Sequence, residues 1–83
     1  MPAQIIVPPG TTAVYAPFTA SVWQVDVSPG IRVSKGQKIL AVEAMKMESV
    51  VSSPLDGEVV EIYARPGDQV APGQVLLAIK GDR

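Results

Sequence analysis

The sequence predicts an all-β domain with the shape of a flattened barrel or sandwich, and three observations lead to this prediction. A unit of strands and turns occurs twice along the chain, apolar and polar residues alternate in its strand segments, and no segment has the apolar spacing of a helix. Aromatic residues make up only 5% of the chain, so the core must be aliphatic, and the many valines favour strands.

The two copies of the repeated unit are offset by 37 residues, as Pro17 is from Pro54. The residues Pro17, Val22, Pro29, Gly30, Val33, Gly36, Gln37, Leu40 and Ala41 recur as Pro54, Val59, Pro66, Gly67, Val70, Gly73, Gln74, Leu77 and Ala78. This register needs no gap. Two copies related by a pseudo-two-fold axis are therefore expected to interlock into one flattened barrel or sandwich.

Within each copy the predicted elements follow in the same order. A strand comes first, in which Trp23, Val25 and Val27 alternate with Gln24 and Asp26, as Val60, Ile62 and Ala64 do with Glu61 and Tyr63. Turns are predicted at Ser28-Pro29-Gly30, Ser34-Lys35-Gly36, Arg65-Pro66-Gly67 and Ala71-Pro72-Gly73, where glycine accepts a positive φ. The continuous apolar runs 39–42 and 75–79 predict strands that are buried on both faces.

The length of 83 residues allows one domain with one core. We expect residues 11–80 to form this core, residues 1–10 to be linker-like and to end in Pro8-Pro9-Gly10, and residues 81–83 to be a frayed tail. The midpoint between the two copies falls at residues 45–46. Both termini should then gather at the opposite end of the domain.

The composition excludes several classes of function. A net charge of −1 and a pI of about 5.1 argue against nucleic-acid binding, which needs a basic surface. No apolar run approaches the length of a membrane span, and the start of the chain does not resemble a signal peptide. The chain has no His and no Cys, so we expect no catalytic residues, no metal site and no disulfides, and a cytoplasmic location.

The segment Glu43-Ala44-Met45-Lys46-Met47-Glu48 departs from the rules that the rest of the chain follows. If Met45 and Lys46 form a two-residue hairpin loop, the turn is of type I′ or II′, which favours Asn-Gly or Gly-X and needs a positive φ. Glu43 and Glu48 would then face each other across the hairpin, where like charges destabilise. Such clustered violations usually mark function. A lone solvated lysine and a pair of acid–base carboxylates are the other interpretations, but no pocket-forming residues accompany the glutamates.

The segment Ala44-Met45-Lys46-Met47, on a turn between two such repeats, resembles the biotinyl domain of biotin-dependent carboxylases. The resemblance covers about residues 13–80 and implies a barrel-sandwich hybrid of two four-stranded antiparallel sheets. It also implies that biotin is attached covalently to Lys46 by a biotin protein ligase. Met45 and Met47 would be the methionines that the ligase reads, and Glu43, Ala44 and Glu48 would complete the recognised turn. Pro54 and Gly57 match the family's downstream Pro-x-x-Gly and are expected to support a turn.

The implied function is that of a carrier without catalysis of its own, because the cofactor and the partner domains supply the chemistry. The biotin arm would move a carboxyl group between a biotin carboxylase site and a carboxyltransferase site, with no nucleic-acid or membrane partner and with a monomeric isolated domain. The gap-free repeat leaves no space for the thumb of bacterial acetyl-CoA carboxylase carriers. The run Ser21-Val22-Trp23-Gln24-Val25 and the apolar approach Val42-Glu43-Ala44 are most similar to urea carboxylases, including urea amidolyase, with pyruvate, propionyl-CoA and acetyl-CoA carboxylases as alternatives.

Three other kinds of domain remain as alternatives. A lipoyl carrier domain of 2-oxo acid dehydrogenases has the same fold, but it typically has Asp-Lys-Ala at the turn, from which Met45-Lys46-Met47 departs. A non-carrier adaptor on this fold, as in efflux membrane-fusion proteins, carries helical hairpins for which this chain has no room. A plain interaction domain with an incidental lysine is the third alternative.

Overall fold

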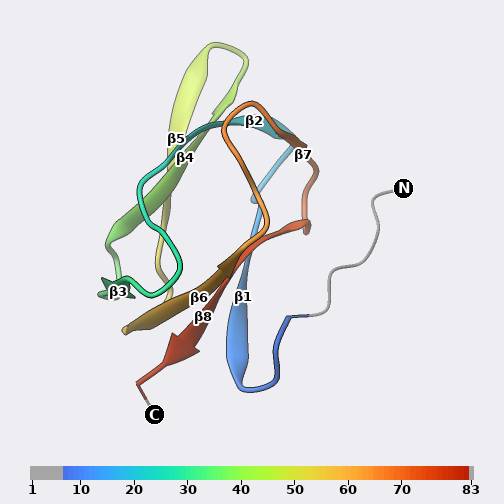
Figure 1. The fold of residues 1–83 in the computed structure, drawn as a ribbon. Helices are drawn as coiled ribbons and strands as arrows, with labels where there is room; N and C mark the ends of the chain where they lie inside the picture. The colour runs from blue at the N-terminus through green and yellow to red at the C-terminus, as the bar shows by residue number, and fades with distance from the viewer. Residues whose placement is uncertain (1–6, 83) are drawn as a thin grey trace.

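The computed structural model describes residues 7–82, which fold into two four-stranded antiparallel sheets (Figure 1). The strands are β1 (Thr11–Tyr15), β2 (Ala20–Val25), β3 (Arg32–Val33), β4 (Lys38–Ala44), β5 (Met47–Ser52), β6 (Gly57–Ile62), β7 (Gln69–Val70) and β8 (Val75–Gly81). One sheet has the order β1-β8-β6-β3 and the other β5-β4-β2-β7. No helix occurs between residues 7 and 82, so the all-β prediction is confirmed.

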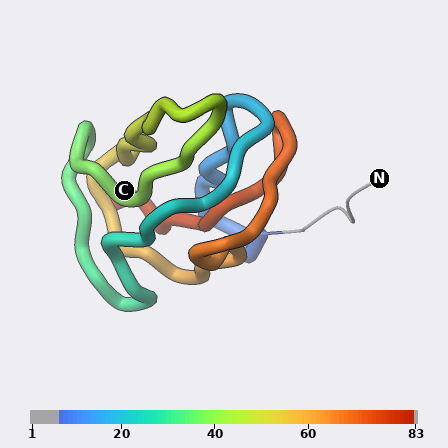
Figure 2. Tube along the Cα trace, turned by 90° about the horizontal axis from the view of Figure 1, so that it is seen from above, coloured from blue at the N-terminus to red at the C-terminus, as the bar shows by residue number. Residues whose placement is uncertain are grey.

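The internal repeat is present in the structure as well as in the sequence. Strands β2, β3 and β4 recur as β6, β7 and β8, each 37 residues later, as from Ala20 to Gly57. Exchanging the two copies converts the strand order of one sheet into that of the other. Backbone hydrogen bonds also recur: Gly36 N donates to Ser53 O at 2.8 Å, and Gly73 N donates to Ala16 O at 3.0 Å. The two halves therefore interlock through equivalent contacts, and the tube in Figure 2 shows them wrapped around one interior.

The core lies between the two sheets and is built from aliphatic side chains of both copies. Its largest fully buried residues are Ile39, Leu40, Leu76, Leu77, Ile79, Val22, Val42 and Val59. The apolar runs 39–42 and 75–79 are buried throughout, as the sequence predicts. The overall extents of 37 × 26 × 16 Å give the flattened shape that two closely packed sheets produce.

A bulge makes the outward face of β2 differ from the simple alternation predicted for it. The register between β2 and β4 shifts between Val22 and Gln24, and Trp23 lies at this shift with 51% of its surface exposed. An extra residue in one strand re-aims its side chain, so Val22 enters the core and Trp23 faces solvent. The same shift occurs between Val59 and Glu61 in β6. The prediction that Trp23 shares a buried face with Val25 is therefore wrong.

Gly57 has a different role from the turn support expected of it. It is the buried first residue of β6, and its φ is not in the left-handed region. A Cβ at this position would overlap the backbone carbonyl oxygen of Lys80 and lie 2.9 Å from Cγ2 of Ile79. Glycine is required here because β6 and β8 approach each other too closely for any side chain.

The start of β1 and the end of β8 lie at one end of the molecule, opposite the hairpin of β4 and β5 (Figure 1). The start of β1 lies beside the end of β8, because Thr11 pairs with Lys80. Strand β8 extends to Gly81, which pairs with Gly57, and Asp82 N donates to Asp56 O at 3.2 Å. Gly81 and Asp82 therefore continue the folded structure instead of fraying. Residues 1–6 and Arg83, also expected to be linker and tail, lie outside the described residues.

Candidate functional site

The hairpin of β4 and β5 ends in a two-residue loop, Met45-Lys46, as the sequence predicts. Ala44 pairs with Met47 directly below this loop, and both loop residues have positive φ, 51° for Met45 and 66° for Lys46. Two consecutive left-handed residues define a type I′ turn, whose twist matches that of a β-hairpin. They are the only residues other than glycine with positive φ within the described chain. The strain of about 1–3 kcal/mol that each such residue carries is thus concentrated at this tip.

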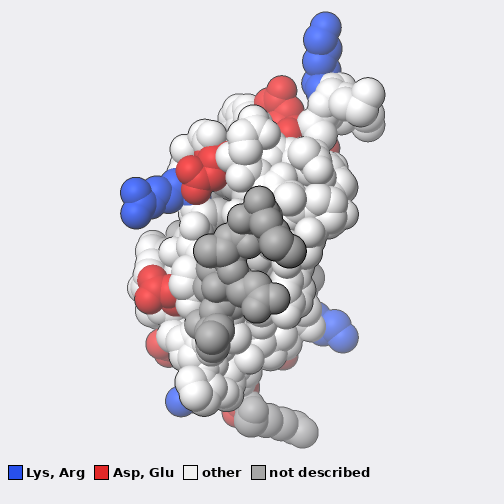
Figure 3. Space-filling model, turned by 90° about the vertical axis from the view of Figure 1, so that its right-hand side faces the viewer, with Lys and Arg blue, Asp and Glu red and all other residues white. Residues whose placement is uncertain are grey.

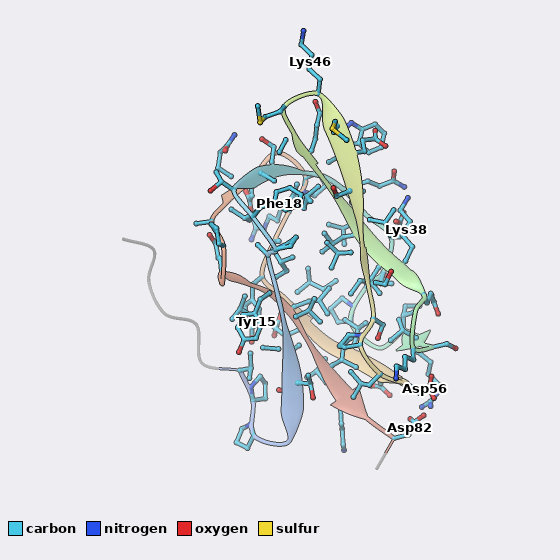
Figure 4. All side chains as sticks on the ribbon, turned by 180° about the vertical axis from the view of Figure 1, so that it is seen from behind. Tyr15, Phe18, Lys38, Lys46, Asp56 and Asp82 are labelled. Atoms are coloured by element: carbon cyan, nitrogen blue, oxygen red, sulfur yellow. The ribbon has the colours of Figure 1, made fainter. Side chains whose placement is uncertain are left out.

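The side chains at the tip are held out in water. Met45 is 95% exposed and Met47 is 72% exposed, although both are apolar. Lys46 lies between them, and its side chain projects from the end of the molecule (Figure 4). In Figure 3 a basic side chain extends into solvent at this end of the molecule. The tip is therefore shaped for contact with another molecule, because isolated folding gains nothing from exposed thioethers.

The two glutamates of the hairpin face each other, again as predicted. Glu43 pairs with Glu48 in the register of β4 and β5, one step below Ala44 and Met47. Glu43 is half-buried and Glu48 is exposed. In residues 7–82 neither carboxylate forms an ion pair, so no cation offsets their repulsion.

The ion pairs of the described residues lie away from the tip. Lys38 Nζ is 3.4 Å from Asp26 Oδ2, and Arg32 pairs with Asp82 at the opposite end of the molecule. The hydrogen bond and the charge of Asp82 raise the pKa of the Arg32 guanidinium above its ordinary value. Lys46 has no ion-pair partner among residues 7–82, and its amine is directly accessible for covalent modification.

A hollow of about 410 Å³ lies beside the tip, where the hairpin extends beyond the neighbouring strand β2. It is lined by Thr19, Ala20, Ser21, Glu43, Ala44, Met45 and Gln69. Sequence reasoning identified Glu43, Ala44 and Met45 but missed Thr19, Ser21 and Gln69. Their only signal in the sequence is that they are uncharged, whereas their repeat counterparts Asp56, Glu58 and Arg32 are charged.

Of the two residues expected to support a turn, only Pro54 lies in one. It is exposed in the bend after β5, where Ser53 Oγ donates to Leu55 O at 2.6 Å. Gly57 follows this bend and acts through close strand packing instead. Neither residue lies beside the tip, because β5 separates them from Lys46 along the hairpin.

The arrangement suits a covalently attached group and does not suit catalysis by the domain itself. In residues 7–82 no group of three or more His, Cys, Asp or Glu side chains is placed to hold a metal ion. That part of the chain also contains no helix long and apolar enough to cross a bilayer. An accessible primary amine at a protruding turn fits an acyl cofactor joined through an amide, since the attached group then keeps the full reach of the lysine side chain.

A family model described as biotin-requiring enzyme matches residues 4–79. The chain belongs to this family. It is a biotin carboxyl carrier domain, a non-catalytic unit with biotin as its cofactor. This agrees with the expectation from the Met45-Lys46-Met47 turn and the repeat.

Curated relatives of the carrier domain are carboxylases. A putative urea carboxylase of Emericella nidulans is 38% identical over 48 residues, which cover 58% of this chain and 4% of that protein. The mitochondrial pyruvate carboxylase of Rattus norvegicus is 46% identical over 41 residues, which cover 49% of this chain and 4% of that protein. The chain thus matches only a small part of the length of each relative.

Two solved structures with the same fold are also carboxylases. A single-chain, multi-domain long-chain acyl-CoA carboxylase superposes with a TM-score of 0.90 at 28% identity, covering 98% of this chain and 8% of that chain. The urea carboxylase of Kluyveromyces lactis superposes with a TM-score of 0.82, also at 28% identity, covering 95% of this chain and 7% of that chain. The barrel-sandwich hybrid expected from the resemblance is therefore confirmed.

Proposed function

We propose that Lys46 is the residue that carries biotin, and that a biotin protein ligase attaches it. The observation that carries this proposal is the position of Lys46 on a strained type I′ turn between two exposed methionines. The Nζ atom of Lys46, in its neutral form, attacks the activated carboxyl group of biotin. An amide bond forms, the activating group leaves with its electron pair, and the amine gives up a proton.

The flanking residues provide the surface by which the ligase recognises the turn. Met45 and Met47 offer flexible, polarisable side chains that fit a partner's apolar surface. Ala44 is small and leaves the approach to the turn open, while Glu43 and Glu48 give the base of the hairpin a negative charge. The rigid hairpin presents all five residues, together with Lys46, in one geometry.

The carrier domain works within a larger carboxylase that also holds a biotin carboxylase site and a carboxyltransferase site. Bound biotin supplies a ureido nitrogen that accepts and releases a carboxyl group. The domain itself supplies the tether, and confinement near both sites raises the effective concentration to about the millimolar range. The tip lies opposite the start of β1 and the end of β8, so a linker that leads away from that end does not obstruct it (Figure 1).

For the acceptor substrate we propose urea, ahead of pyruvate and acyl-CoA compounds. Two of the relatives, from Emericella nidulans and Kluyveromyces lactis, carry the name urea carboxylase. The run Ser21-Val22-Trp23-Gln24-Val25 pointed to the same class in the sequence. Bicarbonate-dependent ATP hydrolysis by the parent enzyme tests this assignment. We expect the hydrolysis to require urea, and neither pyruvate nor an acyl-CoA should support it.

Intact mass spectrometry after co-expression with a biotin ligase and biotin tests the attachment site. We expect one biotinyl group per chain, and none in the Lys46→Arg variant, because arginine keeps the charge but cannot form the amide. Lys35→Arg is the matched control, since Lys35 is an exposed lysine in another turn. It should be modified as fully as the parent chain. A biotinyl group that persists in Lys46→Arg would contradict the proposal.

A further inference from the structure

The hollow beside the Lys46 turn has a counterpart at the opposite end of the molecule, and the internal repeat makes the two comparable. A second hollow there has a volume of about 240 Å³ and is lined by Leu55, Asp56, Gly81 and Asp82. Asp56, Gly81 and Asp82 are the repeat counterparts of Thr19, Ala44 and Met45, which line the first hollow. The fold thus forms a hollow in each copy of the repeat, and the residues that line the two hollows differ.

The second hollow is lined by charged side chains that have partners. Asp82 forms an ion pair with Arg32, and Asp56 Oδ1 accepts a hydrogen bond from Lys35 N at 2.7 Å. In the hollow beside Lys46, the counterparts of Arg32 and Asp82 are Gln69 and Met45. These two residues cannot form an ion pair, and the hollow that they line is the larger of the two.

The polar groups of the first hollow match the hydrogen bonds of a cyclic urea. Gln69 Nε2 donates to Ser21 Oγ at 2.8 Å, which leaves the amide oxygen of Gln69 free to accept and the Ser21 hydroxyl hydrogen free to donate. The carboxylate of Glu43 accepts only, and the hydroxyl of Thr19 is a further donor. Acceptors for two N–H groups and donors for one carbonyl oxygen therefore line the same hollow, beside the apolar atoms of Ala44 and Met45.

We propose that this hollow is a docking site for the ureido ring of biotin carried on Lys46, so that the arm has a retracted state on the carrier domain itself. The proposal rests on the proposed function of Lys46. Met45 forms part of the hollow and precedes Lys46 directly, so the lysine side chain and the acyl chain of the cofactor need only fold back over one residue. The exposed side chain of Met45 then covers the ring, which gives this methionine a role in addition to ligase recognition.

Tethering makes a weak site sufficient for docking. The effective concentration of a group on a short flexible tether is about millimolar, so a dissociation constant in that range gives about half occupancy. The hollow is open and shallow, as such a weak site should be, and the retracted arm leaves it readily when a partner site binds the ring more tightly. An arm that is half retracted exposes its ring less to solvent, and its transfer is slowed by no more than about twofold.

The test compares two acylated lysines at position 46, each installed during translation as a modified amino acid so that no ligase is needed. One carries biotin, and the other carries a pentanoyl group, which has the same amide and the same loss of charge but no ring. Amide and side-chain NMR spectra of the two domains are then compared. We expect shifts at Thr19, Ser21 and the side-chain amide of Gln69 in the biotinylated domain that are absent from the pentanoyl domain.

Variants of the two hollows provide the matched control. Ser21→Leu fills the first hollow and should abolish the ring-dependent shifts, whereas Glu58→Leu, at the equivalent position of the other copy, should retain them. If Ser21→Leu does not fold, Gln69→Leu removes the free amide oxygen and should reduce the shifts in the same way. Two outcomes overturn the proposal. The ring-dependent shifts are then confined to residues 44–48, or they remain unchanged in the variant of the first hollow.

The outcome is independent of whether Lys46 is the natural attachment site, which intact mass after ligase treatment decides separately. If the ligase does not biotinylate Lys46, the proposed function is contradicted. The NMR spectra still report whether the hollow binds the ring. If the ligase biotinylates Lys46 but no ring-dependent shifts occur, only the proposal of a retracted state is contradicted. The two conclusions can therefore fail separately.

Discussion

At the scale of single residues, the site is defined by side chains that stability alone would not select. Met45 and Lys46 both adopt a positive φ, a conformation that asparagine and glycine accept at much lower cost. Gly57 shows the opposite case, because the close approach of β6 to Lys80 permits no other residue. In the proposed function the first departure from local preference serves recognition by the ligase, whereas the second serves packing.

The double substitution Met45→Asn with Lys46→Gly should therefore stabilise the domain. We expect the free energy of unfolding to rise by about 1–2 kcal/mol, because Asn-Gly relieves part of the strain of the two left-handed residues. Chemical denaturation at equilibrium measures this change, and the same variant should accept no biotin. Lys35→Asn, in a turn where the substituted residue has no positive φ, is the control and should change the stability by less than about 0.5 kcal/mol. Unchanged stability in the double variant would show that the turn is not strained.

At the scale of elements, the β4–β5 hairpin combines a rigid ladder with an unfavourable charge pair. Glu43 and Glu48 are cross-strand neighbours, and neither has an ion-pair partner in residues 7–82. No like charges meet at the equivalent place in the other copy, where Lys80 pairs with Thr11 on one side and with Glu58 on the other. The hairpin thus keeps a local repulsion that the matched strands avoid.

Replacing both Glu43 and Glu48 with Gln should not lower the stability of the domain. We expect a gain of a few tenths of a kcal/mol, about 0.2–1 kcal/mol, because the opposed charges are removed while the side chains keep their size. The gain should shrink at high ionic strength, which screens the repulsion in the parent domain. Glu58→Gln is the control, and the loss of one carboxylate that faces two opposite charges, on Arg32 and Lys80, should lower stability slightly. A clear loss in the double variant, measured by denaturation at two salt concentrations, would show that the pair has a stabilising partner.

At the scale of the whole molecule, the pseudo-two-fold arrangement distributes the core evenly between the two copies. Leu40 and Leu77 are repeat counterparts, and both are fully buried between the sheets. The edge strands β1 and β5 are likewise equivalent positions in their two sheets. The two halves of the fold are therefore expected to contribute equally to stability, and the tip depends on the complete barrel for its rigidity.

Truncation of either leucine should consequently cost the same. We expect Leu40→Ala and Leu77→Ala each to lower the free energy of unfolding by about 2–5 kcal/mol, through lost burial and the cavity left behind, and the two losses should agree within about 1 kcal/mol. Urea denaturation of both variants measures this. Val50→Ala, at a position that is 58% exposed, is the control with a much smaller loss. Losses that differ several-fold would contradict an evenly shared core.

The sequence by itself determined the repeat, the strands, the turn at Met45-Lys46 and the pairing of Glu43 with Glu48. These features depend on local patterns: alternation, proline and glycine at turns, and an offset that places two residues at the symmetric midpoint. Only the tertiary structure decided the features that depend on distant segments. Trp23 faces solvent because of a bulge opposite β4, Gly57 is required by the backbone of β8, and Asp82 is held by Arg32.

The hollow beside Lys46 belongs to this second group. Its walls come from β2, β4, β7 and the segment before β2, which are brought together only when the two copies interlock. The sequence shows that Gln69 and Arg32 differ although they occupy equivalent positions of the repeat. No pattern of neighbouring residues, however, indicates that these two positions lie beside equivalent hollows. Patterns along the chain determine elements, because each depends on near neighbours. The site's surroundings depend on which elements pack together, and that is a property of the folded molecule alone.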